Sequence, residues 1–176
     1  MIAFNSTIEA ILLKHKEFLA GNYDMYRNHV YRVFMFCQLQ DGSNNNSEKY
    51  AIASAYHDIG IWTDHTFDYL NPSIKNAEEY LYSIDRIDWI QEISLMIEMH
   101  HKLSAYKSDN PHTIEIFRKA DWIDVSLGLL NYGLNRSEIY AVRNSISNEG
   151  FHKFLLGLLI KNFAKHPFKP FPVFKL

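Results

Sequence analysis

The spacing of the apolar residues constrains this chain more than any other feature. These residues recur mostly at intervals of three and four positions rather than two, which is the period of one face of an α-helix. Only 7 Gly and 5 Pro occur in 176 residues, so few positions interrupt a helix. A chain of this length suits one domain with a single hydrophobic core. We therefore expect an all-α fold, a single-domain helical bundle over residues 1–176.

Turn residues and caps divide the chain into expected helices. Their approximate ranges are residues up to 20, 24–40, 48–59, 72–82, 87–102, a helix beginning near 111, 137–145 and 149–165. The segment IWTDHTFDYLNPS is expected to be an ordered loop, with Pro72 in the first turn of the next helix and Asn71 as its cap. Three prolines in the tail HPFKPFPVFKL exclude further helix, so we expect its aromatic residues to pack on the body or on a partner.

The charge and the cysteine content limit the partners and the compartment. With 18 Lys and Arg against 20 Asp and Glu, the net charge of -2 offers no basic field for extended nucleic acid. The single Cys37 cannot form an internal disulfide, which is compatible with a reducing compartment. The N-terminus does not resemble a secretory signal, and the longest apolar run is far shorter than the ~18 residues that span a bilayer. We expect a cytoplasmic protein without a membrane partner; a homodimer is compatible with its aromatic surface.

Four polar residues occupy positions where apolar ones are expected: His29, His57, Asp58 and Asp121. His29 follows Tyr26 by three residues and Asp121 follows Phe117 by four, so both share an apolar helix face. The adjacent His57 and Asp58 end an expected helix. Because an unpaired buried carboxylate is costly, two carboxylates beside imidazoles indicate a bound cation. A divalent ion held by four protein ligands keeps positions for water and substrate.

Such an ion gives the site a definite chemistry. It can bring the pKa of a bound water near neutrality and polarise a phosphoryl oxygen, which together suffice for hydrolysis of a phosphate ester. Imidazole nitrogen with carboxylate oxygen suits Mn, Fe, Co, Ni or Zn, with Mg as a further option. The expected partner is a small phosphorylated substrate, and the sequence leaves open whether it is a monoester or a diester.

Four segments carry a resemblance to a known family: YRNHVYRV, ASAYHDIG, IEMHHK and FRKADWID. In this order and spacing they resemble the HD-domain superfamily of metal-dependent phosphohydrolases, over roughly residues 20–127, with C-terminal helices and a tail in 128–176. The resemblance implies an all-α fold of the HD type. It also implies that His29, His57, Asp58 and Asp121 bind the metal and that Asp58 orients the attacking water.

The sequence departs from the motifs of several branches of the superfamily, and these departures limit the expected substrate and number of metal ions. The 5′-nucleotidase branch carries a glutamate where this chain has Ile61, and the alarmone hydrolases carry Glu-Asp where it has Ile61 and Trp62. The cyclic dinucleotide branch follows its double histidine with Gly-Tyr-Pro, whereas this chain has KLSAYKSD. Members with two metals supply a further histidine where DYLNPSIKNAEEYL has none. A single ion and an unspecified phosphate ester, which includes nucleotides, remain as the expectation.

Several other polar residues are candidates for catalysis or substrate binding. Asp64 and Asp68, in the loop after the His-Asp pair, are candidate general acids. Candidates for contact with the substrate phosphate are Arg32, His100, His101 and Lys102. One of the two adjacent histidines is alternatively a ligand of a second metal. For each of these residues, the competing interpretation is a solvated side chain without a role in the site.

Two other functions compete with hydrolysis. The same ligand order occurs in two-iron, inositol-oxygenase-like relatives, so a two-iron HD-type oxygenase is one alternative. The other is a non-catalytic module that binds a nucleotide beside a vestigial metal site. The number of ions per chain separates the oxygenase from a one-metal hydrolase, and ligand-induced stabilisation without product would favour the binding module.

Overall fold

The computed structural model describes residues 4–66 and 68–165. Every element in that part of the chain is a helix, which confirms the all-α prediction. The elements are α1 (Ser6–Lys14), α2 (Lys16–Leu19), the 3-10 turn η1 (Ala20–Asn22), α3 (Tyr23–Asp41), α4 (Ser47–Tyr56), α5 (Gly60–Thr63), α6 (Leu70–Ser83), the 3-10 turn η2 (Ile87–Trp89), α7 (Ile90–Met99), α8 (Pro111–Val125), α9 (Arg136–Ser145) and α10 (Phe151–Lys165). The tail after residue 165, with its expected packing, lies outside the described residues.

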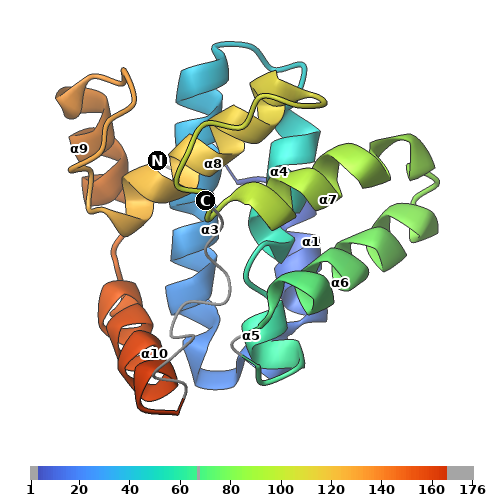
Figure 1. The fold of residues 1–176 in the computed structure, drawn as a ribbon, viewed down its shortest axis with the longest axis vertical. Coiled ribbons are helices and arrows are strands. Elements are labelled where there is room, and N and C mark those ends of the chain that lie inside the picture. Colours follow the sequence, from blue (N-terminus) through green and yellow to red (C-terminus); the bar gives the residue numbers. More distant parts are fainter. Residues whose placement is uncertain (1–3, 67, 166–176) are drawn as a thin grey trace.

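Helix α3 forms the centre of the molecule. It makes its most extensive contact with α8 and also packs on α4, while α6 pairs with α7 and α1 with α4. Figure 1 shows α3 upright, the α6–α7 pair on one side of it and α9 and α10 on the other. Aromatic side chains fill the interior between these helices, among them the fully buried Tyr26, Phe36 and Phe117. Cys37 is buried with them, as a structural cysteine should be.

The helices that precede His15 and His57 are shorter than expected, and each ends just before that histidine. The first breaks after Lys14, where His15 forms the junction between α1 and α2. The third ends at Tyr56 rather than Ile59. Beyond it the backbone closes into i to i+3 hydrogen bonds, from the amide of Ile59 to the carbonyl of Tyr56 (3.1 Å) and from Ile61 to Asp58 (3.0 Å). This tightening turns the chain at the His-Asp pair.

The boundaries around the expected loop also differ. A short helix, α5, lies within it, and α6 begins at Leu70, so Asn71 is not its cap; Pro72 does lie in the first turn. The helix expected over 87–102 starts as a 3-10 turn and ends at Met99. Within the described residues, no helix combines the length and apolar character needed to cross a membrane.

Candidate metal centre

His29 lies on α3 and is fully buried. Its Nδ1 donates a hydrogen bond to Oδ2 of Asp124 on α8, at 2.7 Å. Because the carboxylate accepts that proton, the lone pair of the imidazole resides on Nε2, which points to the interior beside His57. Contact between α3 and α8 therefore sets both the tautomer and the direction of this side chain.

His57 and His100 are each oriented by a hydrogen bond to a main-chain carbonyl. Each follows the last residue of a helix, α4 and α7 respectively. Nδ1 of His57 donates to the carbonyl of Ser54 (2.8 Å), and Nδ1 of His100 donates to the carbonyl of Ile97 (2.7 Å). Both acceptors lie three residues earlier, among the carbonyls that a helix end leaves without a partner. The two Nε2 atoms are thus lone-pair acceptors as well.

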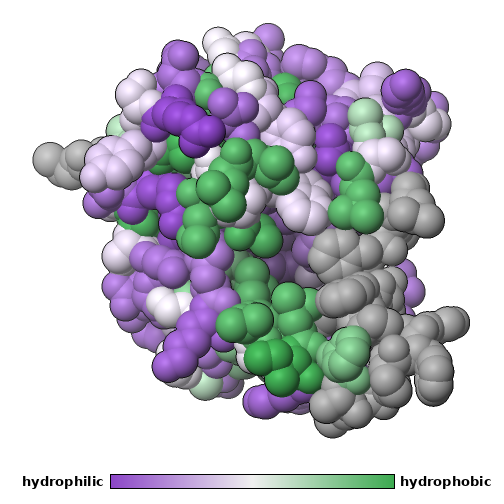
Figure 2. Space-filling model, turned by 60° about the vertical axis from the view of Figure 1, so that its left-hand side comes forward, coloured by the Kyte–Doolittle hydropathy of each residue, from purple (hydrophilic) through white to green (hydrophobic). Residues whose placement is uncertain are grey.

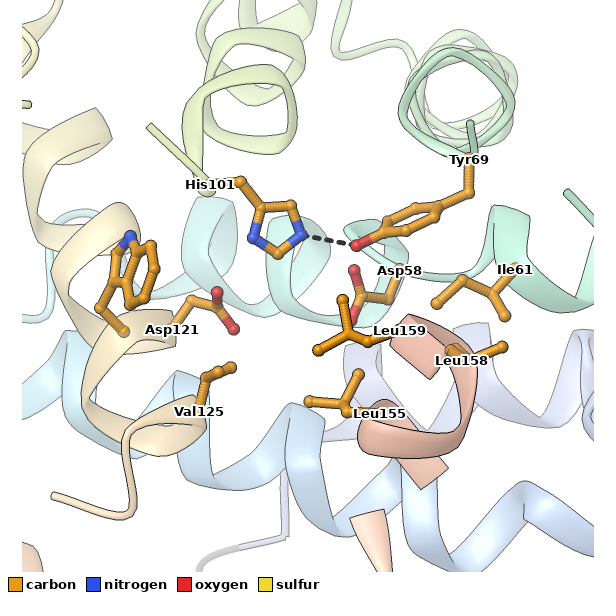
Figure 3. Close-up of a pocket in the computed structure, with 10 residues that line it drawn as sticks. Asp58, Ile61, Tyr69, His101, Asp121, Val125, Leu155, Leu158 and Leu159 are labelled. Carbon is orange, nitrogen blue, oxygen red and sulfur yellow. Dashed lines mark hydrogen bonds between the residues drawn. The ribbon is translucent and has the colours of Figure 1, made fainter. Parts of the chain in front are cut away.

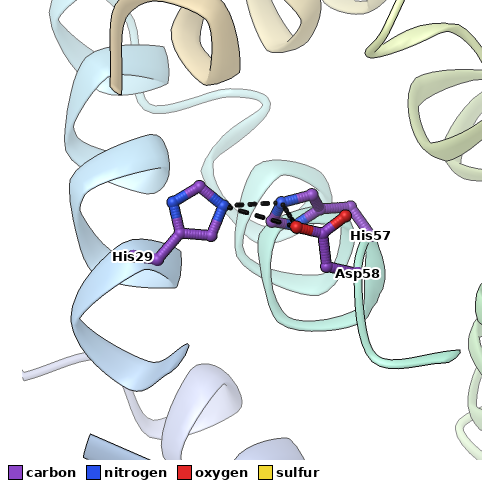
Figure 4. A group of neighbouring side chains, drawn as sticks. All are labelled: His29, His57 and Asp58. Carbon is purple, nitrogen blue, oxygen red and sulfur yellow. Dashed lines mark hydrogen bonds and ion pairs between the residues drawn. The ribbon is translucent and has the colours of Figure 1, made fainter. Parts of the chain in front are cut away.

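These lone pairs converge on the two carboxylates. Nε2 of His29 and Nε2 of His57 are 2.9 Å apart, although neither carries a proton to donate in this tautomer. Oδ2 of Asp58 lies 3.3 Å from Nε2 of His57 and 3.7 Å from that of His29 (Figure 4). Oδ1 of Asp121 lies 3.6 and 3.8 Å from the Nε2 atoms of His29 and His57. Such a gathering of acceptors is favourable only around a positive charge, supplied either by a cation or by a proton on one of the imidazoles.

The spacing fits a divalent ion. Two nitrogen ligands about 2.1 Å from an ion and at right angles to each other are about 3.0 Å apart, close to the 2.9 Å between His29 and His57. Nε2 of His100 and Oδ1 of Asp58 are buried 3.5 Å from one another, and neither has a hydrogen-bond partner among the described residues. Buried polar atoms without partners are costly unless a ligand satisfies them. His29, His57 and Asp58 form a group that could hold a metal ion, and Asp121 lies beside this group without belonging to it.

Electrostatics show how the centre behaves without an ion. Burial lowers the pKa of His29 to about 4. Burial also opposes charge on His57, but the carboxylates of Asp58 and Asp121 outweigh it and raise the pKa of His57 to about 9. Burial raises the pKa of Asp121 to about 6. Without an ion, His57 therefore carries a second proton at neutral pH, on the Nε2 that faces His29, and a divalent cation must displace that proton.

A second group of possible ligands shares one carboxylate with the first. One ligand atom each from Asp58, His100 and His101 lie within 4.8 Å of one another. Nε2 of His101 also lies 2.6 Å from the hydroxyl of Tyr69. His100 is thus a buried member of the centre rather than a solvated helix end. The structure brings together two groups of possible ligands that share Asp58, whereas the sequence led us to expect a single ion.

The sequence analysis missed Asp124, the carboxylate that orients His29. Besides the bond from His29, Asp124 accepts two hydrogen bonds from Arg32, at 2.6 and 2.9 Å, and a guanidinium nitrogen of Arg143 lies 3.4 Å from its Oδ1. Burial opposes its ionisation, but the bonds from His29 and Arg32 outweigh this and hold its pKa below the usual range. The available signal was its place three residues after Asp121, on the same helix face within ADWID.

The structure places the other candidates as follows. The guanidinium of Arg32 donates to Asp124 and to the carbonyl of Ser147 (2.8 Å), so Arg32 supports the carboxylate that orients His29, and it is not among the residues that line the cavity beside Asp58. Asp64 and Asp68 are exposed, and Asp64 accepts a hydrogen bond from the hydroxyl of Thr63 (2.7 Å). Lys102 is half-buried and is not among the residues that line the cavity beside Asp58, whereas His101 is.

Gly60 allows α6 to approach the His-Asp turn. A Cβ at this position would lie 2.5 Å from the carbonyl oxygen of Tyr69 and 2.9 Å from Cβ of Pro72. The amide of Gly60 donates to the hydroxyl of Ser73 at 3.0 Å, which fixes the contact. The start of α6 is thereby held against Asp58, and this brings Tyr69 to the site.

Comparison of the chain with models of protein families, with curated proteins and with solved structures found no match in any of the three. The resemblance to the HD-domain superfamily therefore rests on the residues themselves, and the chemistry has to be argued from the buried His and Asp groups.

Proposed function

We propose that the protein is a metal-dependent phosphohydrolase that cleaves a small phosphate ester. One observation carries the proposal: the Nδ1 atoms of His29, His57 and His100 are each held by an acceptor, so that their Nε2 lone pairs face Asp58 and Asp121. A side chain that is only structural does not need a fixed tautomer directed at other acceptors. Fixed imidazoles beside carboxylates are the arrangement of a catalytic metal site.

The reaction follows from the arrangement. When bound, the ion would supply a Lewis acid for a phosphoryl oxygen and lower the pKa of a coordinated water. Asp58 orients that water and takes up its proton. The water oxygen forms a bond to phosphorus, the bond from phosphorus to the ester oxygen breaks, and the departing alcohol receives a proton. Tyr69 and His101, at the cavity wall beside Asp58 (Figure 3), are placed to hydrogen-bond the phosphate.

The test is turnover of a generic aryl phosphate by protein loaded in turn with Mn, Co, Ni, Zn or Mg. We expect metal-dependent release of inorganic phosphate and a loss of about a hundredfold or more in Asp58→Asn, the range for removal of a general base. Asp88→Asn is the matched control, because Asp88 is exposed and pairs with Arg86. Folded, metal-loaded protein that turns over no phosphate ester with any of these ions would contradict the proposal.

The shared Asp58 favours one second candidate, a two-iron HD-type oxygenase. A carboxylate with ligands on both sides is placed to bridge two ions, since Asp58 belongs to both groups of possible ligands. Elemental analysis distinguishes the candidates: one ion per chain excludes the oxygenase. Two irons per chain, with consumption of O₂ and no release of phosphate from any ester, would favour the oxygenase over the hydrolase.

A further inference from the structure

A mostly apolar cavity opens directly onto the metal centre. It has a volume of about 80 Å³, and its polar wall consists of Asp58, Asp121, Tyr69 and His101. The rest of its wall is apolar and consists of Ile61, Trp122, Val125, Leu155, Leu158 and Leu159. Figure 3 shows the three leucines of α10 facing Asp58, Asp121 and His101 across the cavity. A space of this size beside catalytic carboxylates can hold the organic group of a substrate.

Helix α10, which carries Leu155, Leu158 and Leu159, is anchored at its start to His29 and Asp124. The ring of Phe151, at the start of α10, stacks on His29 with centroids 3.8 Å apart. Nε2 of His152 donates to the main-chain carbonyl of Asp124 at 2.9 Å, so the first turn of α10 is tied to the backbone of the residue whose carboxylate orients His29. Leu155, Leu158 and Leu159 follow Phe151 by four, seven and eight residues and share its helix face.

The described wall of the cavity carries no side chain with a permanent positive charge for further phosphate groups. No Lys or Arg is among the described residues that line it. The two buried arginines nearby have other partners: Arg32 binds Asp124, while Arg118 binds Glu115 and the carbonyl of Lys102. Sites for polyphosphates use such cations to hold the charge of each phosphate. A single phosphate at the ion, with an uncharged group beyond it, matches this wall.

We propose that the substrate is a phosphate monoester of an apolar alcohol, alkyl or aryl, whose organic group packs against the leucines of α10. This inference rests on the proposed phosphohydrolase function and narrows its substrate class. Water adds to phosphorus, the bond to the ester oxygen breaks, and the alcohol leaves with the proton, so that the products are an apolar alcohol and inorganic phosphate. No electron transfer is required.

Binding of alkylphosphonates tests the cavity without chemistry, because their carbon–phosphorus bond is not an ester. Titration calorimetry on Mn-loaded protein would compare methyl-, ethyl-, propyl-, butyl- and hexylphosphonate. We expect affinity to rise about threefold to fourfold for each methylene that is buried, until the chain outgrows the cavity. Adenosine triphosphate should bind more weakly than hexylphosphonate. This series on the unmodified protein does not depend on any variant folding.

A pair of variants on α10 locates the effect. Leu158→Asn introduces a polar group into the cavity wall and should abolish most of the gain with chain length while leaving methylphosphonate binding in place. Leu156→Asn is the matched control, because Leu156 is two residues away, is 58% exposed and does not line the cavity. It is one of the exposed apolar residues of α10, with Ile160 and Phe163. Figure 2 shows apolar side chains gathered on one face of the molecule. The series of Leu156→Asn should match that of the unmodified protein.

The outcomes separate this inference from the function on which it rests. A flat series, in protein that binds methylphosphonate and hydrolyses a generic aryl phosphate, would overturn the apolar substrate class and leave the phosphohydrolase standing. Tighter binding of adenosine triphosphate than of hexylphosphonate would overturn it too. A rising series that is lost in Leu158→Asn supports the cavity assignment, and hydrolysis of butyl phosphate faster than methyl phosphate completes it. A rising series without hydrolysis of any ester would instead remove the phosphohydrolase.

Discussion

Two buried histidines of this protein have opposite surroundings. His29 is fully buried and has Asp124 on one ring nitrogen and the metal-site residues around the other. His15, at the junction of α1 and α2, is 5% exposed, and neither of its nitrogens has a hydrogen-bond partner among the described residues. The rings of His15 and Tyr56 meet edge to face, with centroids 5.6 Å apart. The hydroxyl of Tyr56 likewise has no hydrogen-bond partner among the described residues.

This comparison shows which surroundings suit a buried imidazole to bind a metal ion. Burial lowers the pKa of both histidines, to about 4 for His29. Desolvation therefore does not distinguish them. The acceptor on Nδ1 and the carboxylates facing Nε2 do, because they fix a tautomer and supply the negative charge that a cation neutralises. The His15 region is aromatic packing with an unsatisfied imidazole, whereas the His29 region is built around a charge.

The largest expected effect is stabilisation by metal. An ion that binds only the folded protein should raise the free energy of unfolding by about 4 kcal/mol at a thousand times its dissociation constant. His29→Gln should lose most of this gain, whereas His15→Gln should keep it. Urea unfolding with and without Mn measures both. Equal losses in the two variants would mean that the ion does not distinguish the two regions.

The next effect concerns the support of His29. Asp124→Asn keeps an acceptor for Nδ1 but removes the charge, and we expect metal affinity to fall about 10- to 100-fold, the range for residues that orient a ligand. Competition with a fluorescent chelator measures this affinity. Asp41→Asn is the control, since Asp41 is also tied into a hydrogen-bond network, with Tyr50 and Asn46, but away from the centre. An unchanged metal affinity in Asp124→Asn would show that the charge of Asp124 does not support metal binding.

A smaller effect is expected at His15. Replacing an imidazole whose buried nitrogens are unsatisfied by an apolar side chain, as in His15→Leu, should stabilise the protein by about 1 kcal/mol. Metal affinity should be unchanged, because His15 is not among the possible ligands. Chemical unfolding of metal-free protein at pH 7 tests the stability. A loss of stability in this variant would indicate that the imidazole has a polar role in the folded protein.

The smallest expected effect is a change with pH in the stability difference between His15→Leu and the unmodified protein. Burial, and then the charge of Lys14, lower the pKa of His15 below its ordinary value in the folded state. The unfolded chain thus takes up the proton first as the pH falls below about 6.5. The contribution of neutral His15 is fully present above that pH and is lost on acidification. The stability gap between His15→Leu and the unmodified protein should widen from pH 7 to pH 5; a constant gap would contradict the lowered pKa.

The sequence identified the His and Asp residues that cluster in the structure better than the residues that support them. Helical periodicity placed His29 and Asp121 on apolar faces, and the structure brings them within 3.6 Å. Asp124 was passed over because its partner His29 lies 95 residues away, a pairing that only the packing of α3 on α8 creates. Arg32 was assigned to phosphate for the same reason, since a lone arginine on a helix does not reveal a buried acceptor.

The helices were predictable, and so were ends such as those of α3 and α9, but the ends at the buried histidines were not. No glycine or proline marks the break at His15, and the tightening after Tyr56 begins before Gly60, the expected stop residue. The sequence therefore extended both helices past their histidines. That tightening turns the chain at His57, and the early end of α7 likewise leaves His100 at a helix terminus, where its Nδ1 finds a free carbonyl. Local periodicity does not contain this information.

The most direct test of the central claim is anomalous diffraction from crystals of the Mn-loaded protein. The account predicts an anomalous peak within about 2.0–2.3 Å of Nε2 of His29, Nε2 of His57 and one oxygen each of Asp58 and Asp121. Crystals with no peak among these four side chains at saturating Mn, or with Mn bound only elsewhere on the protein, would contradict it.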